Sequence, residues 1–307
     1  WIPLVFAIYG ACRRYRIERI IAAQVLPVGT AASLVARLLH IPYVVSTHGM
    51  DLLLPKKSQR KGALTRKVLR HAERVIANSA MTGYLVRSHG VPATHIEYIY
   101  PAPVITPVLL LVPSGVIPAQ AGIQSKNVLL TVGRLVPRKG HEYVLRALPG
   151  VRANIPDVHY VVIGDGPHRS ALESLTKELG LQDAVHFLGA LSDQEIARWY
   201  DACSLFVMTP EEIEGDIEGF GIVYLEAQSF GKPVIGSRTG GVAEAVHDGV
   251  TGLLVEPRDT VGIQQALLRL LGDPVYAKRL GEKGRRRVEE EFQWKRQAEK
   301  LQYLLSL

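Results

Sequence analysis

Several residue types that define particular protein classes are scarce in this chain. It contains only two cysteines, Cys12 and Cys203, which lie far apart and form no CxxC pair. That number and spacing argue against a disulfide framework or a zinc site and favour buried thiols in a reduced, cytosolic protein. Aromatic residues make up only 7% of the chain. Because no basic run is interleaved with aromatic residues, we also expect no binding to nucleic acid.

Long apolar runs and an initiating methionine are both missing. No segment has about 20 uninterrupted apolar residues, so we expect no helix that crosses a membrane. Residues 1–9 are apolar and precede arginines, whereas the positive region of a secretory signal comes before its apolar part. We therefore expect the chain to begin inside a longer reading frame, or in one that has lost its start.

Positive charge, in contrast, is in excess. The net charge is +7 and the isoelectric point is about 9.4, values compatible with an anionic membrane surface or an anionic small substrate. Clusters on amphipathic pieces suit peripheral contact with anionic lipid, while solvated helix faces remain an equal alternative. The clusters are Arg13, Arg14 and Arg16; Lys56, Lys57, Arg60 and Lys61; Arg66, Lys67 and Arg70; and residues 285–287.

Apolar runs of strand length alternate with helical patterns almost throughout, which predicts an α/β fold built on parallel sheets. Strands are expected at 19–25, 42–47, 74–77, 96–100, 128–132, 159–163, 184–187, 205–208, 233–236 and 252–255. Helices are expected at 1–16, 30–39, 64–71, 80–88, 142–147, 168–179, 193–201, 222–230, 261–271, 274–291 and 294–305.

A proline-rich stretch interrupts this alternation and divides the chain. Five prolines fall within residues 101–126, which we interpret as a linker because prolines remove strand hydrogen-bond donors. Residues 1–100 then form a first domain and 127–290 a second. The terminal residues 291–307 form a helix that we expect to pack on the first domain.

The strongest functional pattern is Glu218-Gly-Phe-Gly-Ile-Val-Tyr-Leu-Glu226, in which a glycine-flanked loop opens a helix. A helix N-terminus with free backbone N–H groups suits a phosphate or another anionic ligand. Carboxylates accept hydrogen bonds in pairs, which matches vicinal sugar hydroxyls. An acidic loop followed by an ordinary amphipathic helix is the alternative.

Two further loops follow apolar strands, where ligands bind parallel sheets. Arg134 and Lys139, after the strand ending at Val132, could hold a diphosphate; a solvated basic loop is the alternative. His48, after the strand ending at Thr47, could contact a sugar hydroxyl, although a lone histidine is more often structural.

Taken in order, these patterns resemble the C-terminal domain of the retaining glycosyltransferase family 4, the group 1 glycosyltransferases. The matching pieces are Gly133-Arg134-Leu135 with Lys139-Gly140, Gly164-Asp165-Gly166-Pro167, Phe187-Leu188-Gly189, Glu218 to Glu226, and Gly240-Gly241 with Glu244. The resemblance covers nearly all of residues 127–295. It implies the GT-B fold of two Rossmann-like parallel-sheet domains, the first of them incomplete here because roughly three strands are missing.

The resemblance also implies an activity: transfer of a hexose, with retention, from a UDP- or GDP-linked sugar to a glycan or lipid-linked acceptor. Arg134 and Lys139 would neutralise the donor diphosphate beside Gly133, so that no metal or other cofactor is needed. His48 would contact the hexose. We expect such an enzyme in the cytoplasm, with peripheral contact at the inner face of the membrane, in polysaccharide or lipopolysaccharide synthesis.

The remaining roles follow from the same resemblance. Glu226 would bind the ribose hydroxyls, and Leu188 and Gly189 would lie near the base. Glu218 would bind the transferred hexose. Its helpers would be the backbone amides of Phe220, Gly221 and Ile222.

Residues 104–124 do not follow the family pattern, and Gln24 stands where a histidine or another polar residue is usual. Two alternatives therefore stay open. One is a degenerate, non-catalytic fragment that still binds a nucleotide sugar. The other is a different GT-B-like enzyme, such as a sugar epimerase or a phosphorylase.

Overall fold

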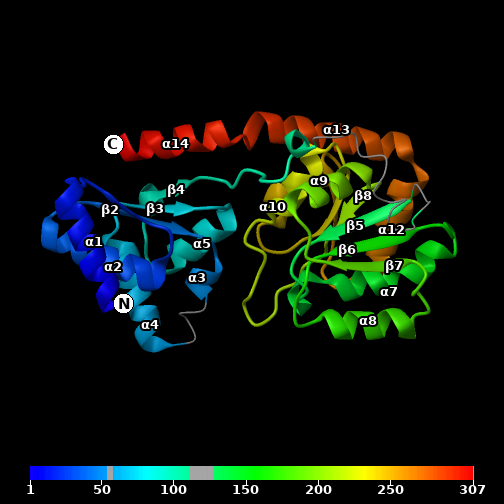
Figure 1. The fold of residues 1–307 in the computed structure, drawn as a ribbon, viewed down its shortest axis with the longest axis horizontal. Helices are drawn as coiled ribbons and strands as arrows, with labels where there is room; N and C mark the ends of the chain where they lie inside the picture. Colours follow the sequence, from blue (N-terminus) through cyan, green and yellow to red (C-terminus); the bar gives the residue numbers. More distant parts are fainter. Residues whose placement is uncertain (54–57, 111–122, 124–126, 307) are drawn as a thin grey trace. The chain divides into compact units, whose positions relative to one another are not determined.

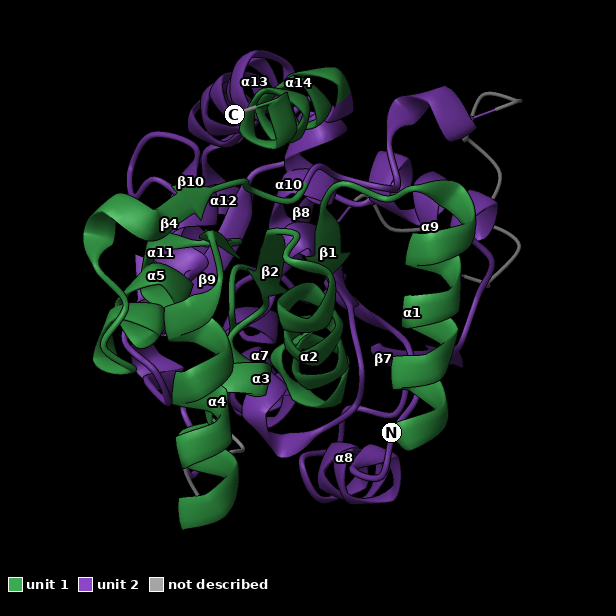
Figure 2. Cartoon of the chain, turned by 90° about the vertical axis from the view of Figure 1, so that its left-hand side faces the viewer, with its two compact units in different colours: residues 1–101, 215–220, 295–307 green, residues 102–214, 221–294 purple. Residues whose placement is uncertain are grey.

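The computed structural model describes residues 1–53, 58–110, 123 and 127–306, and the chain divides into two compact units. Unit 1 comprises Trp1–Pro101, Gly215–Phe220 and Lys295–Leu307, and unit 2 comprises Ala102–Glu214 and Gly221–Trp294 (Figure 2). The loop 215–220, which the sequence places inside the second domain, therefore belongs to unit 1. Most of the expected linker, with Lys56 and Lys57 of the basic clusters, lies outside the described residues.

Unit 1 is built on a four-stranded parallel sheet in the order β1-β2-β3-β4. Its strands are β1 (Ile20–Ala22), β2 (Tyr43–Thr47), β3 (Arg74–Ala77) and β4 (Ile96–Tyr98). Its helices are α1 (Ile2–Tyr15), α2 (Thr30–Leu39), α3 (Met50–Leu53), α4 (Gln59–His71), α5 (Ala80–Ser88) and α14 (Trp294–Ser306). Irregular turns are η1 (Val25–Gly29) and η3 (Ala93–His95).

Successive side chains of β2 and β3 point to opposite faces of this sheet. Val45 and Val75 enter a core shared with α2, α4 and α5, whereas Val44 and Ile76 pack with Leu304 of α14. Helix α14 is also fastened at its end, where the Arg19 side chain donates to the Leu304 carbonyl at 3.3 Å. Helices therefore cover both faces of the sheet (Figure 1).

Unit 2 contains a six-stranded parallel sheet in the order β10-β9-β8-β5-β6-β7. Its strands are β5 (Val128–Val132), β6 (His159–Ile163), β7 (Val185–Gly189), β8 (Leu205–Val207), β9 (Val234–Ser237) and β10 (Gly252–Val255). Its helices are α7 (His141–Arg152), α8 (Arg169–Glu178), α9 (Asp193–Ala202), α10 (Ile222–Ser229), α11 (Val242–Ala245), α12 (Thr260–Gly272) and α13 (Pro274–Glu291). Short turns are η4 (Pro107–Leu109) and η5 (Pro137–Lys139).

The central strand β5 is buried along its whole length, as expected for a parallel strand covered on both faces. In Figure 1, α7 and α8 lie below the sheet and α9 and α10 lie above it. On the α10 side, Phe206 meets the ring of Tyr224 edge-on at 5.5 Å, and Tyr200 stacks on Phe230 at 5.6 Å. These aromatic contacts tie α9 and α10 to β8.

Both cysteines are buried and unpaired. Burial raises the pKa of the Cys203 thiol to about 12, so that this thiol is a core side chain rather than a nucleophile. Among the described residues, no helix combines the length and the apolar character that crossing a membrane demands.

Candidate functional site

Three loops of unit 2 meet at the carboxyl ends of the neighbouring strands β5, β6 and β7. The Gly133 amide donates to the Ile163 carbonyl at 2.9 Å, and the Gly164 amide donates to the Gly189 carbonyl at 2.8 Å. Gly164 has φ +130, and a Cβ atom there would lie 2.0 Å from the Gly133 oxygen. The backbones can approach this closely only because residue 164 has no side chain. Gly133, Gly164 and Gly189, which the sequence identified separately, are thus brought together.

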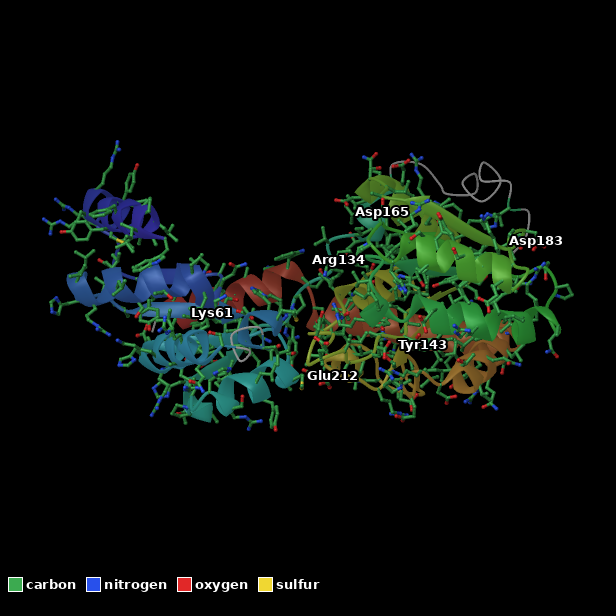
Figure 3. All side chains as sticks on the ribbon, turned by 90° about the horizontal axis from the view of Figure 1, so that it is seen from below. Lys61, Arg134, Tyr143, Asp165, Asp183 and Glu212 are labelled. Atoms are coloured by element: carbon green, nitrogen blue, oxygen red, sulfur yellow. The ribbon has the colours of Figure 1, made fainter. Side chains whose placement is uncertain are left out.

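Both predicted diphosphate-binding cations lie on the loop after β5. The Arg134 side chain is exposed, and it makes no hydrogen bond or ion pair with any residue that the structure describes. Leu135 of the same loop donates its amide to the Asp165 carbonyl at 2.9 Å, and Figure 3 shows Arg134 and Asp165 at one end of this unit. Lys139 ends η5, immediately before α7 begins.

Gly140 is the N-cap of α7, with φ +70. A Cβ atom on it would lie 1.9 Å from the Thr209 carbonyl oxygen, so the loops after β5 and β8 are in backbone contact. The first amides of α7 lie at this point, where the helix dipole favours an anion. An anionic ligand next to Lys139 would therefore also be favoured by the start of α7.

His141, the first residue of α7, is only 2% exposed. Burial, and then the charges of Lys139 and His168, lower the pKa of His141 to about 3. Its imidazole is therefore neutral at pH 7, and the positive charge of this loop comes from the arginine and lysine side chains. Neither ring nitrogen has a hydrogen-bond partner within the described part of the chain.

A buried carboxylate that the sequence did not single out stabilises this end of the sheet. Glu211, in the loop after β8, is 4% exposed and accepts a hydrogen bond from the Tyr143 hydroxyl at 2.9 Å. The Arg258 side chain also donates to the Glu211 carboxylate. The backbone amide of Glu211 donates to the Arg138 carbonyl at 2.9 Å. Burial and the neighbouring carboxylate raise the pKa of Tyr143 to about 12. Position after a strand was the only sequence signal, and many residues share it.

Helix α10 begins as the glycine-flanked pattern predicts. Its N-cap is Gly221, with φ +87, and Ile222 is its first residue. The Tyr224 hydroxyl donates to the Met208 carbonyl at 2.6 Å, which orients the first turn against the end of β8. The Phe220 ring instead packs on Tyr100 of unit 1, with ring centroids 5.6 Å apart.

Glu226 lies in the second turn of α10 and is 5% exposed. One carboxylate oxygen accepts from the Tyr200 hydroxyl at 3.1 Å, and the other accepts from the Ile105 amide at 3.3 Å. Burial raises the pKa of Glu226, and hydrogen bonds from Ile105, Tyr200 and Val104 partly offset that effect. The carboxylate predicted to bind ribose is thus already occupied by donors of its own unit.

His48 and Glu218 lie together in unit 1. His48 is exposed at the end of β2, and Glu218 is buried in the loop 215–220. A Cβ atom on Gly219 would lie 2.9 Å from the His48 carbonyl oxygen, so this loop rests directly on the His48 turn. Ile217 anchors the loop in the core of unit 1. This packing is why residues 215–220 do not belong to unit 2.

The predicted site residues are therefore divided between the units. Leu188 and Gly189 end β7 and are partly exposed. Unit 2 holds Gly133, Arg134, Lys139, Leu188, Gly189, Gly221, Ile222 and Glu226, and unit 1 holds His48, Glu218 and Phe220. Over residues 1–53, 58–110 and 127–306, no group of three or more His, Cys, Asp or Glu side chains is arranged to hold a metal ion.

Comparison with known proteins adds two family matches. The model of the glycosyl transferases group 1 family matches residues 116–287, and the model of the glycosyl transferase 4-like domain matches residues 1–102. A GDP-mannose-dependent alpha-(1-6)-phosphatidylinositol monomannoside mannosyltransferase of Mycolicibacterium smegmatis is 37% identical over 188 residues, or 60% of this chain and 49% of the relative. The chain thus spans about half the length of that relative.

A second curated relative is the D-inositol 3-phosphate glycosyltransferase of Frankia alni, 30% identical over 82% of this chain and 65% of its own length. Among solved structures, Anabaena HepE in complex with UDP-glucose superimposes with a TM-score of 0.85 at 25% identity, covering 99% of this chain and 82% of that one. Sucrose-phosphate synthase from Thermosynechococcus elongatus gives a TM-score of 0.84 at 27% identity, covering 98% and 76%. The two Rossmann-like sheets are those of the GT-B fold.

Proposed function

Because the chain belongs to the glycosyl transferases group 1 family, we propose that it transfers a hexose, with retention, from a nucleotide sugar to a glycan or lipid-linked acceptor. The observation that carries this proposal is the close approach of Gly133, Gly164 and Gly189 at the carboxyl ends of β5, β6 and β7, where the loop after β5 also carries Arg134 and Lys139. The absence of a side chain at Gly133 leaves space beside its backbone, and the two cations suit a diphosphate. Relatives named for GDP-mannose and a solved neighbour holding UDP-glucose support a nucleotide-linked hexose as donor.

Gly133 supports the position of the donor in particular. Its φ lies outside the left-handed region, and among the described residues a Cβ atom there would meet only the Met208 sulfur, at 3.8 Å. The fold of unit 2 therefore does not require glycine at this position. A ligand that approaches the backbone closely would explain the missing side chain.

The chemistry follows from where charge develops. The acceptor oxygen bonds to the anomeric carbon, the sugar–phosphate bond breaks with its electrons passing to the diphosphate, and the acceptor proton passes to the departing diphosphate. Arg134 and Lys139 stabilise the negative charge, as preorganised cations do in a transition state. His48 and Glu218 hold the hexose. No side chain acts as a nucleophile, which is consistent with retention by attack from the leaving-group face.

The nucleoside interacts with α10 and the end of β7. Ribose hydroxyls bind Glu226 in place of the Ile105 amide, because both oxygens of that carboxylate are already occupied. Leu188 and Gly189 lie beside the base. The backbone amides of Gly221 and Ile222, at the start of α10, face the anionic part of the donor.

Two substitutions test donor binding. Arg134→Ala should reduce transfer on the order of 10² to 10³-fold, and Gly133→Ala should weaken nucleotide binding without lowering the melting temperature. Arg285→Ala, which removes an exposed pair with Glu289, is the matched control for the loss of one arginine. The measurements are calorimetric titration with UDP, GDP and their hexoses, followed by transfer assays. If none of these nucleotides binds, the proposal is wrong; binding without transfer would favour the degenerate fragment.

We also propose that the protein works in the cytoplasm, in peripheral contact with the inner face of the membrane. Ile2 and Phe6 of helix α1 are 60% and 71% exposed, Trp1 just before the helix is 62% exposed, and Arg13 and Arg14 of the same helix are also exposed. Apolar side chains beside arginines are typical of helices that lie on anionic lipid. In a flotation experiment, the protein should rise with vesicles rich in phosphatidylglycerol. The double variant Arg13→Glu, Arg14→Glu should stay behind in the dense fraction. Equal flotation of both proteins would contradict this contact.

A further inference from the structure

Asn78 follows strand β3 and lies at the same edge of the unit 1 sheet as His48. Strands β2 and β3 are parallel neighbours (Figure 1), and their last residues, Thr47 and Ala77, lie opposite each other. His48 and Asn78, the next residues along the chain, therefore leave the sheet side by side at its carboxyl edge, where ligands bind parallel sheets. No role has yet been given to Asn78.

The loop 215–220 brings a third segment to this edge. A Cβ atom on Gly219 would lie 2.9 Å from the His48 carbonyl oxygen and 3.8 Å from Asn78 Nδ2. The residue before Gly219 is Glu218, which we expect to hold the hexose together with His48. All three segments belong to unit 1. The side-chain nitrogen of Asn78 therefore lies against the loop that carries Glu218.

The first turn of α5 holds the Asn78 amide in one orientation. Ser79, the N-cap of α5, accepts from the Thr82 amide at 3.0 Å, and its hydroxyl donates to Thr82 Oγ1 at 3.0 Å. The Thr82 hydroxyl in turn donates to Asn78 Oδ1 at 2.7 Å. Each hydroxyl has a single hydrogen, and both hydrogens are used in this chain of hydrogen bonds. Since Ser79 and Thr82 are fully buried, the amide oxygen of Asn78 is fixed from a rigid part of the unit.

The side-chain nitrogen of Asn78 is available to a ligand. Asn78 is partly exposed, and within the described part of the chain its side chain makes a hydrogen bond only through Oδ1, so that Nδ2 keeps both of its N–H donors. An amide whose oxygen is already fixed loses little freedom when its nitrogen binds a ligand, which favours affinity. Because the group is neutral, it suits a hydroxyl oxygen better than a diphosphate, which charged donors bind more strongly.

We infer that Asn78 contacts the transferred hexose, and that its Nδ2 atom donates a hydrogen bond to one hydroxyl oxygen of that sugar. His48 and Glu218 approach the sugar from the same edge of unit 1. Asn78 takes no part in making or breaking bonds, so that it selects the hexose rather than catalysing its transfer. Thr82 is a positioning residue, because it acts only through the Asn78 amide. The inference rests on the proposed transferase function and adds to it a residue that determines which hexose is accepted.

Comparison of a nucleotide with its hexose derivative isolates this contact. Titration calorimetry on the full chain measures UDP against UDP-glucose and GDP against GDP-mannose. Asn78→Ala should weaken binding of the nucleotide sugar about ten-fold and leave the affinity for the nucleotide alone unchanged, because the cations expected to hold the diphosphate lie in unit 2. Asn154→Ala is the matched control, since Asn154 is an exposed asparagine after α7 and its loss should change neither affinity. An equal loss for both ligands in Asn78→Ala, or no loss, would overturn the inference.

Deoxy analogues of the same nucleotide sugar identify the hydroxyl group that Asn78 contacts. Each analogue lacks a single hexose hydroxyl, and wild type should bind one of them about ten-fold more weakly than the parent sugar. Asn78→Ala should bind that analogue as tightly as wild type does, because the hydrogen bond is missing in both cases. A structural role of Asn78 would instead weaken binding of every analogue by the same factor, a result that contradicts the inference.

Thr82 provides a second test if Asn78→Ala does not fold. Thr82→Val removes the hydroxyl that fixes the Asn78 amide and should weaken binding of the nucleotide sugar about three-fold or more, whereas Thr82→Ser should restore the wild-type affinity. Equal affinities of these two variants would refute the inference. If UDP or GDP binds but these contrasts are absent, the hexose inference fails and the transferase proposal stands. If neither nucleotide binds, the transferase proposal fails, and the inference fails with it.

Discussion

His141 should make the stability of unit 2 dependent on pH. The side chain is 2% exposed, and its pKa is lowered from 6.5 to about 3. Because the folded-state pKa lies below the unfolded value, the unfolded chain binds the proton first as pH falls. Stability is therefore complete above pH 6.5 and is lost progressively as pH falls toward 3.

The size of this loss follows from the two pKa values. Between pH 7 and pH 5 the unfolded imidazole becomes almost fully protonated while the folded one stays neutral, which lowers the free energy of unfolding by about 2 kcal/mol. His141→Leu removes the titration and leaves the pocket filled. The difference in free energy of unfolding between wild type and His141→Leu should therefore change by about 2 kcal/mol over this range.

Urea denaturation at pH 7 and pH 5 measures the effect, followed by tryptophan fluorescence, which unfolding changes because Trp199 is buried in unit 2 whereas Trp1 and Trp294 are already exposed. Other histidines contribute equally to both proteins and cancel in the difference. His71→Leu, at an exposed position on α4, is the control and should follow wild type at both pH values. The same pH dependence in wild type and His141→Leu would refute the reasoning.

Three other predictions concern the packing of unit 2. Gly164→Ala should lower the free energy of unfolding by about 3 kcal/mol or more, because its Cβ would lie 2.0 Å from the Gly133 oxygen. Gly272→Ala at the end of α12, where no other segment that the structure describes would lie within 4 Å of the added Cβ, should be neutral or stabilising by up to about 1 kcal/mol; equal urea midpoints for the two variants would contradict this contrast. Tyr200→Phe should lower the free energy of unfolding by about 1–2 kcal/mol, because Glu226 loses the hydroxyl donor that Tyr200 supplies; an unchanged urea midpoint would count against that hydrogen bond. Since burial raises the pKa of Glu226, wild type should lose stability relative to Glu226→Gln as pH rises from 4 to 7, and the opposite trend would show that the carboxylate is not desolvated.

Elements that depend on neighbouring residues could be predicted from the sequence. Helix α2 and strands β5 and β6 have the bounds expected, because a β-branched run or a 3.6-residue period is a local pattern. Strand β1 is shorter than residues 19–25, since only Ile20–Ala22 pair with β2 before η1 begins. The four-residue helices α3 and α11 were not expected, because a single turn carries no periodic signal.

The candidate site also has features that the sequence identified and contacts that only the structure showed. Glycine and charge patterns at strand ends identified Gly133, Arg134, Lys139 and the start of α10, and their functional roles stay predictions. The sequence could not show that Glu211 is buried beneath the β5 loop or that Ile105 and Tyr200 occupy Glu226. These contacts join residues that lie far apart along the chain.

The sequence alone therefore determined the type of fold, the family and the strand ends at which chemistry is expected, because short local patterns of residues are enough to recognise each of them. Only the tertiary structure decided that the loop 215–220 rests on the His48 turn, and that the Asn78 side chain lies against the same loop. Such groupings depend on how separate segments pack. Burial and hydrogen bonding between distant residues have no signature in the order of the residues themselves.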